Sequence, residues 1–195
     1  MIMKRFLLVL LAAIFTFPAV YAQQEKASKE EAKIQKQREK EQKKAMREAQ
    51  EMASFNAALL AIKNNSFVLE ADRVEFKRGT FINVVSTTNF VMQEGDEATV
   101  QLSFNGAAIG PNGVGGLTVE GAVSNQDLST DKKGNVNYKF MINGVGISAT
   151  ITIRMAKGSN YCTATVTPNF NSNRTEFTGY LKPRKGANIH KGMAL

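Results

Sequence analysis

The alternation of hydrophobic and polar positions divides this chain into three parts. An apolar run at residues 6–17 follows Lys4 and Arg5. A stretch rich in Lys, Glu, Gln and Ala then occupies residues 23–63 and contains no glycine or proline. From residue 64 onward, apolar and polar residues alternate with a period of two. This order predicts a hydrophobic leader, a charged helix and a β-domain.

The period-two region predicts antiparallel strands that have one face in a core and one in water. No helical periodicity lies between the apolar runs, which excludes a βαβ architecture. The fold class is therefore mainly β, a meander of about eight strands that forms a barrel or a sandwich. Strands are expected near residues 66–77, 80–93, 97–105, 117–124, 135–142, 145–156, 160–168 and 175–181.

The segment 142–145, Ile-Asn-Gly-Val, predicts a tight hairpin. Asn-Gly is the preferred pair for a two-residue type I′ turn, because both positions need a positive φ. Such a turn sets the register of the strands that flank it. It would place three pairs on one apolar face: Ile142 opposite Val145, Phe140 opposite Ile147, and Tyr138 opposite Ala149.

Residues 23–51 predict a charged helical spacer, because their apolar residues form no sustained stripe. In the next turns Met52, Phe55, Leu59 and Ile62 recur at helical spacing. These side chains should dock on an apolar surface, most simply that of the all-β domain, which we assign to residues 52–192. The spacer is expected to be solvated or a weak coiled coil, and self-association through it stays open. Glutamates among the lysines argue against a membrane-surface helix.

Residues 1–22 have the pattern of a secretory signal peptide, with a basic start, a short apolar middle and a cleavable end. Pro18 is expected to break the helix, and Val20-Tyr21-Ala22 predicts cleavage after Ala22. The apolar run is shorter than the ~20 residues that span a bilayer. The expected product is periplasmic or secreted, with no transmembrane span in the mature chain.

The net charge and the cysteine content agree with the predicted leader, charged helix and β-domain. The chain carries a net charge of +8, and removal of Lys4 and Arg5 leaves +6. A basic C-terminal stretch is expected to be a solvated tail, although it offers charge for anionic lipid or glycan; it contains Lys182, Arg184, Lys185 and Lys191. Export argues against a nucleic-acid partner. The single cysteine, Cys162, lies in an alternating segment and is interpreted as a core residue.

A glycine-rich stretch at residues 105–116, followed by Gly121, is the most unusual local composition. A phosphate-binding loop would lead into a helix, whereas this stretch leads into a predicted strand. We interpret it as a tight or bulged crossing between strands, or as an exposed backbone surface for a glycan, a peptide or a partner strand. The candidate ligand or partner residues are Asn112, Gly113, Gly115, Gly116 and Gly121.

Catalytic and metal-binding signatures are scarce. The chain has no HExxH or CxxC motif, and its one histidine, His190, lies in the basic tail. We therefore predict no catalytic, cofactor-binding or metal-binding residues and no cofactor. Glu94, Asp96 and Glu97 surround a turn glycine and are interpreted as a solvated hairpin turn rather than a calcium site. A glycosidase-like carboxylate pair remains an alternative, with these candidates: Glu70, Asp72, Glu75, Glu120 and Glu176.

Three stretches have a recognisable composition: STTNFV at residues 86–91, NGVGGLTVEG at residues 112–121 and GYLKP at residues 179–183. With them the chain resembles the exported bacterial family known as domain of unknown function 4251. The resemblance covers roughly residues 55–192 and rests mainly on the glycine stretch. It implies a compact all-β domain in the envelope of gut-dwelling Gram-negative bacteria. It supplies no activity and no site residues.

The sequence thus favours a non-enzymatic exported envelope protein that binds a small ligand or an envelope partner. The alternatives are a carboxylate-dependent hydrolase in a β-barrel and a lipocalin-like carrier of apolar ligands. Two carboxylates about 5–10 Å apart in an open interior would favour the hydrolase. An interior filled with Phe, Ile and Val would oppose it. An apolar cavity of about several hundred Å³ would favour the carrier.

Overall fold

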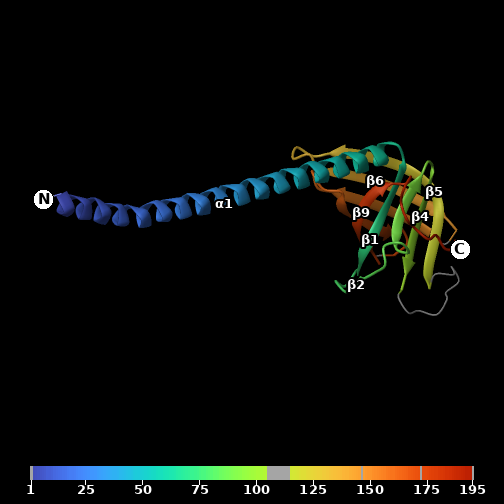
Figure 1. Cartoon of the computed structure of the whole chain (residues 1–195). Helices are drawn as coiled ribbons and strands as arrows, with labels where there is room; N and C mark the ends of the chain where they lie inside the picture. Colours follow the sequence, from blue (N-terminus) through green and yellow to red (C-terminus); the bar gives the residue numbers. More distant parts are fainter. Residues whose placement is uncertain (1, 105–114, 146, 172, 195) are drawn as a thin grey trace. The chain divides into compact units, whose positions relative to one another are not determined.

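One long helix precedes nine β-strands in the part of the chain that the structure describes (Figure 1). The computed structural model describes residues 2–104, 115–145, 147–171 and 173–194, with side chains from residue 30 onward. The elements are α1 (Ile2–Lys63), β1 (Ser66–Phe76), β2 (Phe81–Asn83), β3 (Phe90–Glu94), β4 (Glu97–Ser103), β5 (Gly116–Thr130), β6 (Val136–Gly144), β7 (Ile147–Met155), β8 (Tyr161–Pro168) and β9 (Thr175–Pro183).

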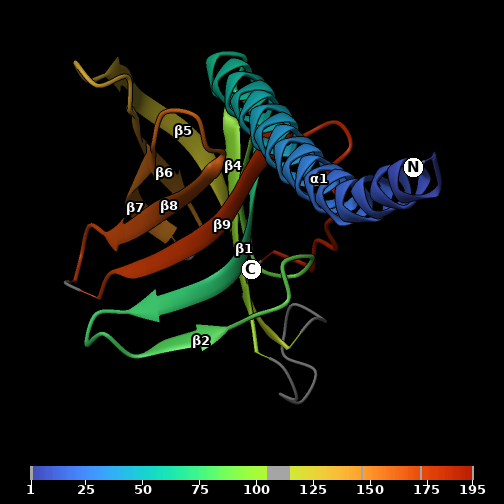
Figure 2. The same cartoon turned by 60° about the vertical axis from the view of Figure 1, so that its left-hand side comes forward.

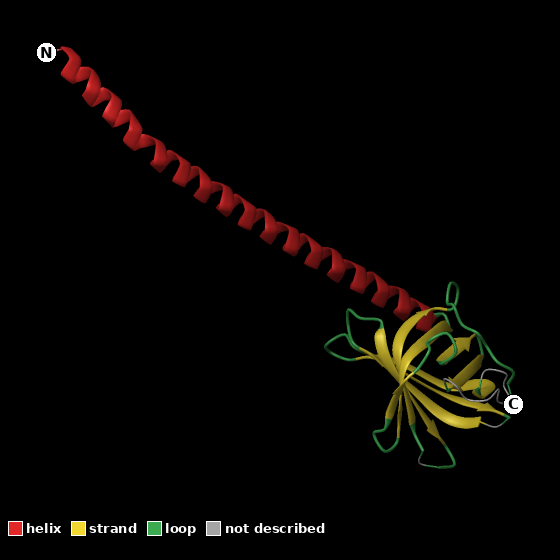
Figure 3. Ribbon diagram, turned by 60° about the horizontal axis from the view of Figure 1, so that its bottom comes forward, coloured by secondary structure: helices red, strands yellow, loops and turns green. Residues whose placement is uncertain are grey.

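Eight of these strands form a closed antiparallel barrel in the order β1-β3-β4-β5-β6-β7-β8-β9. The barrel closes because β9 pairs back to β1, and Figure 2 shows these two strands side by side. The ninth strand, β2, is short and pairs with the second half of β1. Figure 3 shows that the described chain after the helix contains strands and loops only. The predicted antiparallel meander is confirmed, and of its two expected forms the structure has the barrel.

The strand expected at residues 80–93 is instead two strands, β2 and β3, and this expectation was wrong. Both pair with the same edge of β1, β3 with its first half and β2 with its second half. Between them the chain turns at Asn89, whose side chain is fully buried. Its Nδ2 donates to the Val85 carbonyl at 3.0 Å, and its Oδ1 accepts from the Ser103 backbone N–H at 2.7 Å. The bond to Ser103, which joins two different elements, has no signature in the alternation pattern.

The register predicted for the β6–β7 hairpin was also wrong. Gly144 pairs with Ile147, so the strand pairing continues through the predicted Asn-Gly turn at residues 143 and 144. Ile142 therefore lies opposite Ala149 instead of Val145. The physical reason is tertiary: the end of β6 is also paired with β5, which keeps residues 142 and 143 in the ladder. The shift preserves the inward face, because it moves each partner by an even number of residues.

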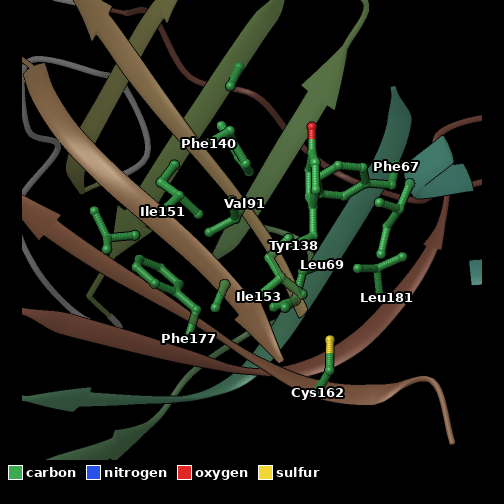
Figure 4. Close-up of a cluster of buried hydrophobic side chains, with 14 of the residues drawn as sticks. Phe67, Leu69, Val91, Tyr138, Phe140, Ile151, Ile153, Cys162, Phe177 and Leu181 are labelled. Carbon is green, nitrogen blue, oxygen red and sulfur yellow. The ribbon is translucent and has the colours of Figure 1, made fainter. Parts of the chain in front are cut away.

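The barrel interior is a continuous hydrophobic core. Figure 4 shows Phe67, Tyr138 and Phe140 gathered in it, and the Phe67 ring lies edge-on to the other two at 6.0 and 6.5 Å. The Tyr138 hydroxyl donates to Gln93 Oε1 at 2.9 Å, which satisfies it inside the core. Burial raises the pKa of Tyr138, and the bond to Gln93 opposes this. The other large side chains with almost no exposed surface include Leu69, Ile142, Ile151, Ile153, Met155, Phe177 and Leu181.

Cys162 is part of this core, as the sequence predicted. Burial raises the pKa of its thiol to about 12. We therefore expect alkylation of the folded protein near pH 8 to be slower than that of the unfolded chain by about a thousandfold, since only the thiolate reacts. Mass spectrometry after iodoacetamide treatment with and without urea would measure this. Rapid labelling of the folded protein would contradict the burial.

The same shift has a consequence for stability at high pH. The unfolded chain releases the thiol proton near pH 9, its ordinary value, whereas the folded chain keeps it up to about pH 12. The folded form thus binds more protons in this window, so the free energy of unfolding should fall as the pH rises through it. The variant Cys162→Ala has no thiol, so this fall should be absent from its free energy of unfolding. Urea unfolding of the unchanged protein and of Cys162→Ala at several alkaline pH values measures how the two free energies of unfolding diverge.

Helix α1 contributes to two separate units of the chain, residues 1–48 and residues 49–195. In the first unit, all described side chains, from Glu30 to Glu48, are exposed.

The helical backbone passes through Pro18, where a break was expected. A proline removes one backbone hydrogen bond, and the turns on either side retain theirs. Among the described residues, no helix is both long and apolar enough to cross a bilayer.

In the second unit, the end of α1 packs on one end of the barrel. Phe55 and Ile62 are buried in the barrel's core cluster, Leu59 is half-buried against it, and Met52 is 39% exposed. The helix stops because Asn65 adopts a positive φ of 51°, a conformation that asparagine tolerates at helix ends. The Asn65 carbonyl then accepts from Gly95 N–H in the β3–β4 turn at 2.8 Å. We call this the closed end of the barrel.

The C-terminal segment 184–194 is docked on the barrel, so the expectation of a solvated tail was wrong. Ala187 and Ile189 pack on an outer-face cluster of Val68, Phe90 and Met92. The backbone is held by Gln101, which is fully buried. Its Nε2 donates to the His190 carbonyl at 2.8 Å, and its Oε1 accepts from Gly192 N–H at 2.8 Å. Contacts between residues about ninety positions apart leave no trace in local composition.

Candidate functional site

The two ends of the barrel differ, and this difference defines the candidate site. The closed end carries the β3–β4, β5–β6 and β7–β8 turns and the end of α1. The opposite end carries the β4–β5, β6–β7 and β8–β9 connections. We call it the open end. Alternating strand direction puts these two sets of connections at opposite ends of the barrel.

A pocket of about 200 Å³ opens at this open end. It lies inside the barrel mouth, between the last residues of β4 and β8 and the first residues of β5, β7 and β9. We call it the mouth pocket. It is lined by Val100, Leu102, Leu117, Val119, Ile147, Ser148, Ala149, Val166, Pro168, Phe170, Thr175 and Phe177.

The lining is apolar apart from two hydroxyl groups, and one of these makes hydrogen bonds to neighbouring asparagine side chains. Ser148 Oγ donates to Asn143 Oδ1 at 3.0 Å and accepts from Asn169 Nδ2 at 3.0 Å. The Thr175 hydroxyl is the other. None of the lining residues named above is charged. An unpaired buried charge would be costly here, so the mouth pocket suits an uncharged apolar group.

Large apolar side chains at the rim of the mouth pocket are exposed to water. Phe170, in the β8–β9 connection, is 72% exposed, and Leu117, at the start of β5, is 46% exposed. Further inside the barrel, next to the lining residues Ala149 of β7 and Val166 of β8, Ile151 and Ala164 are fully buried. The pocket thus lies between the exposed rim and the filled core.

Comparison with known proteins places this barrel in a family. The family described as "Domain of unknown function (DUF4251)" matches residues 48–181. The chain belongs to the DUF4251 family. The resemblance seen in the sequence is thereby confirmed, although the match ends before the docked segment 184–194.

A solved structure supports the same assignment. The chain is similar to a DUF4251 family protein from Bacteroides eggerthii DSM 20697, whose crystal structure was determined at 1.95 Å resolution. The two are 46% identical over 73% of this chain and 95% of the other, with a TM-score of 0.63. No curated protein matches the chain. Membership in DUF4251 therefore brings a fold and no described activity.

The residues proposed as a ligand or partner loop divide into two groups in this DUF4251 domain. Asn112 and Gly113 lie outside the described residues. Gly115 has a φ of 76°, and Gly116 begins β5 beside Leu102 of β4. Gly121 lies where β5 approaches β6 closely: a Cβ there would stand 2.5 Å from the Asn143 carbonyl oxygen. Gly116 and Gly121 thus serve close strand pairing, while Leu117, which follows Gly116, lines the mouth pocket.

The carboxylates of the hydrolase alternative are not brought together in the barrel interior. Each interacts outside it with a basic or hydroxyl group: Glu70 with Lys182 at 2.7 Å, Asp72 with the Tyr161 hydroxyl at 3.1 Å, Glu75 with Arg73 at 2.7 Å, Glu120 with Lys191, and Glu176 with Arg174 at 3.4 Å. Burial and the bond to Asp72 raise the pKa of Tyr161. The interior is filled with Phe, Ile and Val, the arrangement that opposes this alternative.

Metal-ligand geometry does not appear in the described DUF4251 domain either. Over the described residues, no three His, Cys, Asp or Glu side chains are grouped closely enough to hold a metal ion. Glu94 and Glu97 face each other across the β3–β4 turn, where Glu94 pairs with Arg184 at 3.4 Å. The mouth pocket itself was not predicted. Alternation placed Val100, Leu102 and Ala149 on inward faces, but no local pattern shows that space remains between them.

Proposed function

We propose that this DUF4251 protein is an exported, non-catalytic binding protein that takes an apolar group into the mouth pocket. The observation that carries the proposal is an apolar pocket at the open end of the barrel with no charged lining residue. Its volume of about 200 Å³ compares with engineered cavities of about 150 Å³ that bind benzene. It lies below the range of about 300–1,000 Å³ that encloses drug-sized ligands. The pocket therefore fits a small ligand, or one end of a larger one.

A direct binding measurement tests this proposal. N-phenyl-1-naphthylamine is uncharged and apolar, and it fluoresces on leaving water. The chain has no tryptophan to interfere with it. We expect saturable binding that is weakened at least about tenfold in Ala149→Leu, whose added carbons occupy the pocket.

The matched control is Ala122→Leu, which adds the same atoms at an exposed position of β5. It should bind the probe as the unchanged protein does. Circular dichroism establishes that both variants are folded. Equal binding by Ala149→Leu and Ala122→Leu would contradict the proposal, as would the absence of saturable binding.

Export is the second part of the proposal, and the basic start, apolar run and cleavable end of residues 1–22 support it. Expression of the full chain in a Gram-negative host should yield a product that begins at Gln23. Cell fractionation and intact mass measurement test this. A product that retains residues 1–22 in the cytoplasm would contradict it. The variant Ala22→Arg should block cleavage at this position.

A further inference from the structure

We infer that the mouth pocket binds the aliphatic end of an anionic amphiphile, with the head group held outside at a basic part of the rim. The inference rests on the proposed function and adds the class of ligand. It comes from three features of the open end: the kind of side chain that lines the pocket, its depth, and the charge beside its entrance.

The lining favours an alkyl chain over a flat ring. Half of the twelve lining residues have branched aliphatic side chains, contributed by β4, β5, β7 and β8, and these surround the space from several sides. Only two aromatic rings take part, Phe177 in the wall and Phe170 at the exposed rim. A flat ring is best held between parallel faces. A rounded space lined by methyl groups suits a flexible chain.

The depth of the pocket limits how much of the chain enters. A volume of about 200 Å³ holds on the order of seven groups, if each methylene fills about the 30 Å³ that a water molecule has in the liquid. The fully buried Ile151 and Ala164 then close the way inward. A longer molecule must leave the remainder of its chain and its head group outside, so the ligand enters end-on.

The charge beside the entrance favours an anionic head. Phe76 at the end of β1 pairs with Thr175, a lining residue, so the β1–β2 turn that follows lies at the same rim. That turn contains Lys77 and Arg78, which are exposed. Arg174 precedes Thr175 and pairs with Glu176 at 3.4 Å. The described residues of the β4–β5 and β6–β7 connections, Phe104, Gly115 and Val145, are uncharged. Residues 73–78 and 174–176 together carry four basic and two acidic side chains, so the rim has a positive excess on this side.

The test uses three series of n-alkyl ligands with four to twelve carbons, each kept below its micellar concentration: alkanoates, alkyl glucosides and alkyltrimethylammonium salts. Calorimetry or displacement of N-phenyl-1-naphthylamine measures affinity. We expect it to rise about threefold to fourfold per methylene until about seven are buried and then to level off. At equal length, alkanoates should bind most tightly and ammonium salts least.

Two variants distinguish the contribution of the ligand's alkyl chain from that of its charged head group. Ala149→Leu should make the affinity level off at a shorter chain, because it removes part of the depth. Arg78→Gln should weaken alkanoates about threefold or more and leave the glucosides unchanged. Its control is Lys132→Gln, an exposed lysine in the β5–β6 turn at the closed end. An affinity that is independent of chain length or of head charge would overturn the inference.

Failure of the inference is distinguishable from failure of the proposed function. If the naphthylamine probe binds and Ala149→Leu blocks it, while the alkyl series shows neither trend, the pocket binds another class of apolar group. Sedimentation with phosphatidylglycerol and phosphatidylcholine vesicles identifies the source of the chain. Binding to phosphatidylglycerol vesicles that Ala149→Leu abolishes would mean that a membrane lipid supplies it. Vesicle binding unaffected by Ala149→Leu would contradict insertion into the pocket.

Discussion

Replacing Phe55 by alanine is expected to lower the free energy of unfolding by about 3–5 kcal/mol, the cost of removing a buried aromatic side chain from a core. Phe55 is 6% exposed and belongs to the same core cluster as the barrel interior. Its loss would leave a cavity at the closed end. Because small domains have total stabilities of about 5–15 kcal/mol, this is a large share. Urea unfolding followed by circular dichroism gives the value.

Leu60→Ala is the matched control for this substitution. Leu60 lies on the same helix and is 58% exposed, so its truncation should change the free energy of unfolding by no more than about 0.5 kcal/mol. Similar losses for both variants would mean that the helix end does not pack on its own barrel in solution. Phe55→Ala could instead abolish self-association and leave the free energy of unfolding unchanged. That result would show that Phe55 packs on a second chain.

Replacing Gly121 by alanine is expected to cost more than about 3 kcal/mol or to prevent folding. The added Cβ would stand 2.5 Å from the Asn143 carbonyl oxygen and 2.6 Å from its carbon, both backbone atoms of the paired strand. Backbone in a closed barrel cannot move away without breaking its ladder, so relief would disrupt the β5–β6 pairing. The same ladder keeps residues 142 and 143 out of the predicted hairpin turn.

Ala122→Gly serves as the comparison for Gly121→Ala. It changes the neighbouring exposed residue and should cost about 1 kcal/mol or less, the usual penalty for glycine in a strand. The melting temperature and the yield of folded protein measure both variants. If Gly121→Ala melted within a few degrees of the unchanged protein, its role in close strand approach would be refuted. That result would favour the interpretation of Gly121 as part of a ligand or partner surface.

Much of the barrel was predictable because the side-chain period of a strand is independent of its partner. The inward rows of β6 and β7, including Tyr138, Phe140 and Ile153, were identified from alternation alone. They stayed inward although the hairpin register was wrong, since the shift was even. The division of residues 80–93 into β2 and β3 was not predictable. It depends on the hydrogen bond from Ser103 N–H to Asn89 Oδ1, which joins residues 14 positions apart in the sequence.

By itself, the sequence determined the local features of this protein: the leader pattern, the charged helix, the strands' inward faces and the core position of Cys162. Each follows from spacings within one element, and such spacings act through short-range geometry. Only the tertiary structure decided barrel closure, strand register, the docking of segment 184–194 and the mouth pocket. These depend on which distant segments meet and how much space their side chains leave, and no single element contains that information.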